Sequence, residues 1–193
     1  QYSFSVSDNK GVKIVADGGV DTLTGEAVTI TLTASKGSLY VSALTTIVEA
    51  AGTDAETVLA NLGLSSDFDL STSNPLENLQ AQKVNASLIN IIAIGEGLLE
   101  GAGLSDSAGD ELIVAQIVQI LKTGTDISSA ASIKSIIDTT SAGLSDAIKT
   151  KVDVLSNSVA QSLANTNAQI NDAGSVSQIA TYQKATLDDT SSL

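Results

Sequence analysis

The stretch from Gly18 to Gly52, GGVDTLTGEAVTITLTASKGSLYVSALTTIVEAAG, changes its periodicity partway along. Up to Val41, β-branched or apolar residues alternate with Thr and Ser, which is the pattern of a half-buried strand. From Ala43 onward, small and aliphatic residues recur at helical spacing. The sequence therefore predicts a strand that leads directly into a helix.

The junction itself has the chemistry of a helix start. Ser42, Thr45 or Thr46 can cap the first turn, because a hydroxyl side chain accepts a hydrogen bond from a free backbone N–H there. Leu44 is then expected to enter the core beneath the sheet. A capped step of this kind would fix the strand layer against the helix layer.

Short alternating runs around this junction predict a small antiparallel sheet of about four strands. The expected strands are residues 1–7, 12–16, 27–34 and 39–44. Turn sequences such as SDNKG and SKGS separate them. Four strands of this length have too little area to be stable alone, so we expect them to pack on helices.

The rest of the chain predicts helices divided by glycines and capping residues. We expect them from Thr53 or Asp54 to Gly63, from Pro75 with fraying near Gly95 to Gly103, from near Ser105, from Asp126 or Ser128 onward, from Ser145 to about Ile170, and over residues 175–187. The predicted fold class is α+β, with a β-rich lead-in at residues 1–43 packed on a multi-helix bundle at residues 44–193. We expect the two parts to unfold as one unit.

Composition narrows the functional classes. The 193 residues include no Cys, His, Met or Trp, so the commonest general base and the soft metal ligands are missing, and we expect no enzyme. With 22 acidic against 9 basic side chains the net charge is −13, which disfavours a nucleic-acid partner. The most apolar run, Leu88–Ile94, is far shorter than the roughly 20 residues of a membrane helix, so no membrane span is expected.

Strong acidity, together with abundant Ser, Thr, Ala and Gly, is typical of extracellular or cell-surface proteins. The chain opens on Gln1 rather than Met. We therefore expect either that a leader peptide is removed or that this stretch is cut from a longer polypeptide.

Carboxylates near turns are the candidate metal ligands, with calcium as the candidate ion. The four candidates are Asp17, Asp21, Asp67 and Asp69. Calcium accepts such oxygens in flexible geometry, but none of these stretches has the EF-hand spacing. The favoured interpretation is that these aspartates form turns. No catalytic or cofactor-binding residue is predicted.

The amino-terminal run QYSFSVSD suggests an interaction by strand addition. Tyr2, Phe4 and Val6 alternate with serines, so one face of an extended strand would be apolar. Such a strand can add to the open sheet edge of a second copy. The alternative is that the strand pairs within its own domain.

Several separated motifs resemble a module found in very large secreted and surface proteins of marine and other aquatic bacteria. The motifs are GGVDTLTG, LTASKGSLYVSALTTIVEAAG, VLANLGLSSDFDLSTSNPLE, LANTNAQINDAG and IATYQKAT. The hallmark of that module is a Ser/Thr-Pro-Leu-Thr-Thr-Leu step followed by Leu-Gly-Leu, Asp-Leu and Asn/Asp-Pro. It falls here on Ser42, Leu44, Thr45, Thr46, Leu62, Gly63, Leu64, Asp69, Leu70, Asn74 and Pro75. The sequence departs from the hallmark at Ala43, where Pro is usual, and at Ile47, where Leu is usual.

The resemblance covers roughly Val12 to Leu187 and implies a structural or adhesive role in an extracellular bacterial assembly, such as a biofilm matrix. Its partners would be copies of itself or neighbouring surface domains. A filament subunit joined by its amino-terminal strand is the alternative, and a calcium- or glycan-binding module is the lesser one. Exposed aromatics usually mark glycan sites, and the chain has only three Tyr and two Phe.

Overall fold

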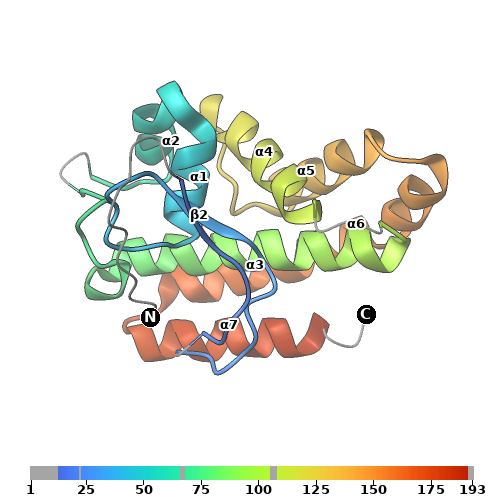
Figure 1. Ribbon diagram of the computed structural model, residues 1–193. Helices are drawn as coiled ribbons and strands as arrows, with labels where there is room; N and C mark the ends of the chain where they lie inside the picture. The colour runs from blue at the N-terminus through green and yellow to red at the C-terminus, as the bar shows by residue number, and fades with distance from the viewer. Residues whose placement is uncertain (1–12, 22, 66–67, 105–107, 191–193) are drawn as a thin grey trace.

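The computed structural model describes residues 13–21, 23–65, 68–104 and 108–190; residues 188–190 are described by their backbone alone. In these ranges the chain is mostly helical, with a small two-stranded antiparallel sheet (Figure 1). The long helix α3, Leu79–Ala102, runs through the middle of the molecule. The α+β class is therefore confirmed in its coarse form.

The sheet is smaller than the sequence predicts. Strand β1, Ile14–Ala16, pairs with β2, Leu32–Ala34, so that Ile14 lies opposite Ala34. Among the described residues these are the only two strands, and the prediction of about four is wrong. The predicted strand at residues 39–44 is absent because the Leu39 amide donates to the Ser71 carbonyl at 2.7 Å and a helix begins at residue 43. Residues 1–7 lie outside the described part.

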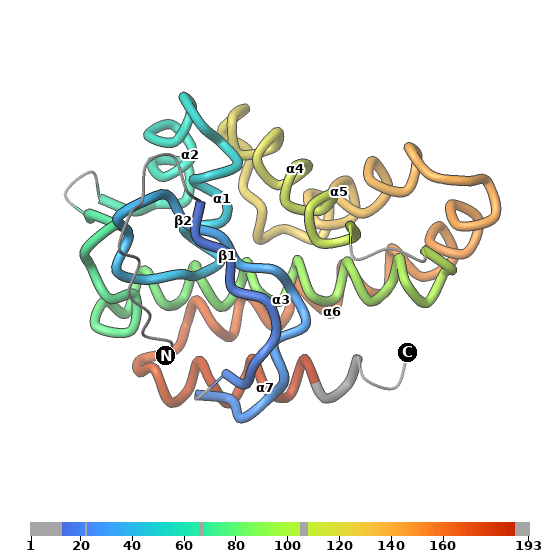
Figure 2. Tube along the Cα trace, viewed as in Figure 1, coloured from blue at the N-terminus to red at the C-terminus, as the bar shows by residue number. Residues whose placement is uncertain are grey.

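A tight loop connects β1 and β2 and folds back on itself. Val20 and Ala27 form an isolated antiparallel bridge, and the Asp21 amide donates to the Glu26 carbonyl at 2.9 Å. Gly25 closes this turn with a φ of 77°, a left-handed conformation that side chains disfavour. Figure 2 shows this amino-terminal segment, in blue, crossing α3 on its way to the last helix.

The junction at Ser42 is a capping box, as the sequence predicts. Helix α1, Ala43–Ala51, begins after Ser42, whose hydroxyl accepts from the Thr45 amide at 3.2 Å. The Thr45 hydroxyl in turn accepts from the Ser42 amide at 2.8 Å. Leu44 is fully buried, as expected.

The remaining helices follow the sequence pattern closely. They are η1 Gly52–Asp54, α2 Ala55–Asn61, η2 Pro75–Glu77, α4 Gly109–Lys122, α5 Ala130–Ala142, α6 Asp146–Asp172 and α7 Val176–Thr190. Ser145 caps α6 as predicted, whereas α5 is capped by Ser129 rather than by Asp126 or Ser128. The predicted start of the long helix at Pro75 is wrong, because Pro75 opens only a short 3-10 turn and Asn78 caps α3.

Helix α3 stays regular through Gly95, where the predicted fraying begins, and ends at the far limit of the predicted range. Gly95 lies inside it, and a Cβ atom placed there would come within 2.9 Å of the Ile113 side chain of α4. The glycine therefore serves close helix packing and does not end the helix. The helix ends at Gly103, which has a φ of 113°.

Helices α3 and α6 lie antiparallel and cap each other with lysines. Lys83, near the start of α3, donates to the carbonyl of Asn171 at the end of α6, at 2.7 Å. Lys151, near the start of α6, donates to the carbonyl of Ala102 at the end of α3, at 2.9 Å. Each cation thus satisfies a free carbonyl at the negative end of the neighbouring helix.

One hydrophobic cluster connects the amino-terminal segment to the helices. Ile30 belongs to it together with Leu44 of α1, Leu99 of α3 and Ile117 of α4, each at most 2% exposed. A smaller cluster joins α3 to Ile170 and Ile179 at the turn between α6 and α7. None of the helices in the described ranges is long and apolar enough to span a membrane.

Candidate functional site: an apolar groove beside the amino-terminal segment

The most distinctive surface feature is a groove with a cavity of about 210 Å³. We call it the apolar groove. The β1–β2 loop and residues 39–42 form one side, η2 adds a rim, and α3 and α7 form the floor. Segments that are far apart in the sequence bound the groove. No single sequence motif could therefore predict it.

Aliphatic side chains that face solvent converge on this groove. Leu39 is 68% exposed, Val20 58%, Leu76 38% and Leu23 36%. All four line the groove, although they come from separate parts of the chain. Single exposed aliphatics are ordinary, but a cluster in a groove is typical of an interaction surface.

Two buried glutamines lie in the groove with unpaired atoms. Gln82 of α3 is 3% exposed and Gln183 of α7 is 1% exposed, and both line the cavity. Gln82 Oε1 and Gln183 Nε2 have no hydrogen-bond partner among the described residues. The neighbouring Asn85 differs, because its Oδ1 accepts from the Leu44 amide at 3.3 Å. The groove therefore offers one free acceptor and one free donor within an apolar lining.

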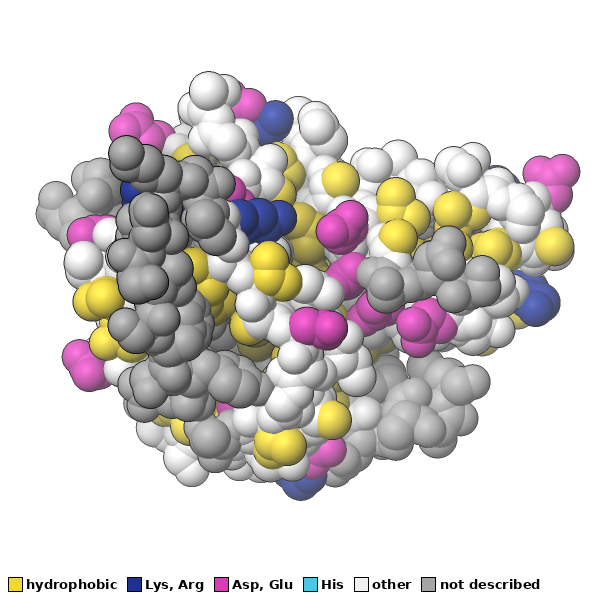
Figure 3. All heavy atoms as spheres, in the orientation of Figure 1, with side chains coloured by type: hydrophobic (Ala, Val, Ile, Leu, Met, Phe, Trp, Pro, Cys, Tyr) yellow, Lys and Arg dark blue, Asp and Glu magenta, His cyan; other side chains and the backbone are white. Residues whose placement is uncertain are grey.

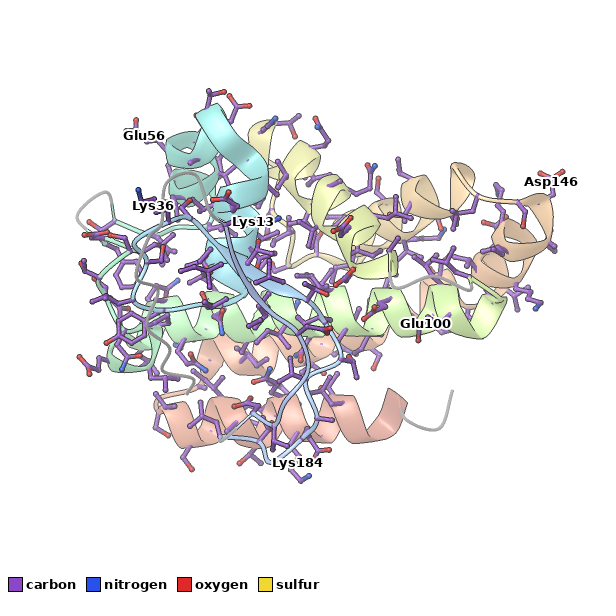
Figure 4. All side chains as sticks on the ribbon, viewed as in Figure 1. Lys13, Lys36, Glu56, Glu100, Asp146 and Lys184 are labelled. Carbon is purple, nitrogen blue, oxygen red and sulfur yellow. The ribbon has the colours of Figure 1, made fainter. Side chains whose placement is uncertain are left out.

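The charges at the groove rim are acidic and partly paired. Asp21 and Glu26 line it, and Glu26 forms an ion pair with Lys184 of α7. Figure 4 labels Lys184 at the foot of the molecule, where α7 meets the amino-terminal loop. This ion pair ties the loop to α7 across the base of the groove. The carboxylate of Asp21, which is not part of this ion pair, would repel an acidic ligand.

A second notable cluster is a buried carboxyl pair where α3 meets α4. Asp110 is 2% exposed, and its Oδ2 accepts from the Thr31 amide at 2.7 Å. Burial raises the pKa of the nearby Glu96 to about 7, and the charges of Asp110 and Glu100 add to the shift. Acidic side chains gather just right of centre in Figure 3, while Figure 4 labels Glu100 near the end of α3. This cluster connects the amino-terminal segment to the helices.

A second cavity, of about 440 Å³, is polar and lies between α3, α6 and the residues near Asp126. Asn167 of α6 lines it and is 2% exposed, and neither of its amide atoms has a hydrogen-bond partner within the described part of the chain. Lys83 also lines it, but its ammonium group already donates to the carbonyl of Asn171. Unlike the apolar groove, this cavity has no cluster of exposed aliphatic side chains.

The predicted calcium ligands are not brought together within the described part of the chain. Asp21 accepts from the Leu23 amide at 2.9 Å and from the Thr24 hydroxyl at 3.1 Å. Asp69 accepts from the side chain and amide of Ser71 and from the Thr72 hydroxyl, and these hydrogen bonds hold its pKa below the usual value. Both aspartates therefore stabilise their own turns, as the turn-former interpretation holds.

No set of three or more acidic, His or Cys side chains in the described ranges is arranged to hold a metal ion. Asp17 is exposed on the β1–β2 loop, and Asp67 lies outside the described residues. Calcium binding at these aspartates stays a prediction.

The strand-addition prediction is not tested by the described residues, and the apolar groove was not predicted from the sequence. The proposed donor residues Tyr2, Phe4 and Val6 lie outside the described part of the chain. The groove and its two glutamines were not predicted, because Gln82 and Gln183 are a hundred residues apart and have no distinctive local pattern. The carboxyl pair of Glu96 and Asp110 was not predicted either, because it depends on how α4 packs on α3 and buries both side chains.

Comparison with protein-family models, with curated proteins and with solved structures finds no match for this chain.

Proposed function

We propose that this chain is a non-enzymatic structural and adhesive module of an extracellular bacterial surface or matrix assembly. It joins copies of itself, or neighbouring surface domains, through the apolar groove. The observation that carries this proposal is the convergence of Leu39, Val20, Leu76 and Leu23 on one groove. Covering these side chains removes apolar surface from water, which is the main driving force for association.

The composition supports a structural role for the module. A net charge of −13 keeps separate molecules apart in solution, so that non-specific aggregation is disfavoured. Association then depends on a specific apolar contact that outweighs the repulsion. The resemblance to modules of large surface proteins supports the extracellular setting.

A filament subunit is the second candidate function. In this version the amino-terminal strand of one copy is added to the next copy. The unpaired Gln82 Oε1 and Gln183 Nε2 favour it, because a peptide backbone supplies both kinds of partner.

Sedimentation velocity over a range of protein concentrations tests the proposal. We expect the unaltered chain to associate, and Leu39→Asp to weaken association at least tenfold because it places a charge in the groove. Val154→Asp is the matched control, since Val154 is 74% exposed on α6 and does not line the groove. A chain that stays monomeric at every concentration, or a Leu39→Asp variant that associates normally, contradicts the proposal.

A further inference from the structure

The two unpaired amide atoms in the apolar groove indicate what kind of partner fits it. A buried polar group without a hydrogen bond destabilises the free chain, because it has lost its contact with water and gained no partner. Gln82 Oε1 requires a donor and Gln183 Nε2 requires an acceptor, and both side chains are more than nine-tenths buried. A ligand that fills the groove and supplies both partners would recover this cost.

An extended apolar peptide meets these requirements. Its backbone presents N–H and C=O groups along the strand, which match the free acceptor of Gln82 and the free donor of Gln183. Its side chains point alternately to opposite faces, so every second residue can enter the aliphatic lining. The cavity of about 210 Å³ is larger than the roughly 150 Å³ cavity that accommodates benzene, so one aromatic ring fits.

We infer that the occupant is the segment Tyr2–Val6 of a second copy of this chain. This inference rests on the proposed function above and names the partner of the same groove. The segment has apolar residues at every second position, two of them aromatic. Residues 1–7 carry no charged side chain, so this stretch can approach the acidic groove rim without adding repulsion between side chains.

The arrangement would repeat from molecule to molecule. The donor segment and the groove are different surfaces of the same chain, so each contact leaves one donor and one groove free. Such a heterologous contact extends into a filament when the rotation between copies does not close a ring. The same groove that links two copies therefore suffices to build a polymer.

Cysteine cross-linking tests which segment occupies the groove. The chain contains no Cys, so introduced thiols are the only ones present. Phe4→Cys and Leu39→Cys variants are mixed in equal amounts, one of them labelled with ¹⁵N, and oxidised gently. We expect the mixed disulfide to exceed either homodimer several-fold by mass spectrometry. A random mixture of dimers overturns the inference.

The double variant Phe4→Cys/Leu39→Cys distinguishes exchange between copies from closure within one chain. At low concentration, a monomer that loses two hydrogens on oxidation has its own segment in its own groove, and this result also overturns the inference. Intermolecular disulfides that join position 4 to position 39 support it.

Removing the amides tests the backbone contact directly. Gln82→Leu and Gln183→Leu remove an unpaired buried group from the free chain, so its urea midpoint should stay level or rise. Association should weaken about tenfold in each variant. Gln80→Leu is the control, because Gln80 is exposed on the same helix and does not line the groove. Normal association of both groove variants contradicts the backbone contact.

Deletion of residues 1–7 separates this inference from the proposed function. We expect a folded monomer with an open groove. If the shortened chain still associates and Leu39→Asp abolishes that association, the groove is the interface but the occupant is wrong. If the shortened chain unfolds, the segment pairs within its own domain and the inference fails. If the full-length chain never associates, the proposed function fails, and the inference that rests on it fails with it.

Discussion

The amino-terminal segment and the helical body are stabilised by different forces. In the helical body, the aliphatic side chains of α3, α4, α5 and α6 pack into one dry cluster. The segment from Lys13 to Ser42 has only a three-residue pairing between β1 and β2. Ile30 places it in the same cluster, and polar contacts to the helices fix the rest of it, which include the Thr31 amide on Asp110 and the Glu26–Lys184 ion pair.

This difference explains where the apolar groove lies. A helix pair can close its interface along its whole length, because side chains from both helices interdigitate. A segment fixed by Ile30 and a few polar contacts leaves gaps between these points, and the exposed Leu39 and Val20 line one such gap. The apolar groove is therefore found on the weakly packed side of the molecule.

Shortening a buried side chain in the helical body should cause the largest loss of stability. Leu99 of α3 is fully buried in the main cluster, so Leu99→Ala should lower the free energy of unfolding by about 2–5 kcal/mol. Urea denaturation followed by circular dichroism measures this loss.

The control for that substitution is Leu155→Ala. Leu155 of α6 is 39% exposed, so this change should lower the free energy of unfolding far less. Equal losses at the two positions would show that the helical body does not depend on the buried cluster. The contrast between the two regions would then be wrong.

The carboxyl pair where the two regions meet should make stability depend on pH. The folded-state pKa of Glu96 is about 7 against an ordinary value of 4.5, so the folded state binds the proton more tightly than the unfolded state. Stability from this group is therefore fully present below pH 4.5 and is lost as the pH rises through 7. The loss amounts to at most about 3 kcal/mol.

Glu96→Gln should remove this dependence and stabilise the chain at pH 8, with little change at pH 4. Melting temperatures measured from pH 4 to 8 test the expectation. Glu100→Gln is the control, since Glu100 is exposed and contributes least to the shift. A Glu96→Gln profile that keeps the original slope between pH 5 and 7 would place the titration elsewhere.

Local sequence patterns were sufficient to predict most of the helices. Ser145 and the stripe of α6 are recognisable because cap and periodicity lie within one continuous stretch. The helix start at Ser42 was predictable for the same reason, although the strand predicted to lead into it is absent. Gly95 was misread, because its role depends on Ile113 of another helix and not on its neighbours in sequence.

The predicted strands failed where distant contacts decide the conformation. Leu39 and its neighbours alternate like a strand. However, the Leu39 amide donates to the Ser71 carbonyl, and the side chains of this stretch line the groove. The candidate site depends even more on distance. Gln82 and Gln183 meet one cavity only after α3 and α7 pack together, so no local signal could identify them.

The polar contacts of the amino-terminal segment should be individually weaker than the buried aliphatic packing. The hydroxyl of Thr46, on α1, accepts from the Thr33 amide of β2 at 2.8 Å, and both residues are buried. Thr46→Val keeps the shape of the side chain but leaves that amide unpaired, at a cost of about 1–3 kcal/mol. Hydrogen exchange should show faster exchange at the Thr33 amide, with little change in α6.

Thr123→Val is the matched control, because the Thr123 hydroxyl donates to the Ile120 carbonyl at an exposed helix end. It should change stability by less than about 0.5 kcal/mol. If Thr46→Val instead accelerated exchange equally in β2 and in α6, the two regions would open as a single unit. The amino-terminal segment would then be as firmly anchored as the helices, and the groove beside it could not be attributed to weaker packing.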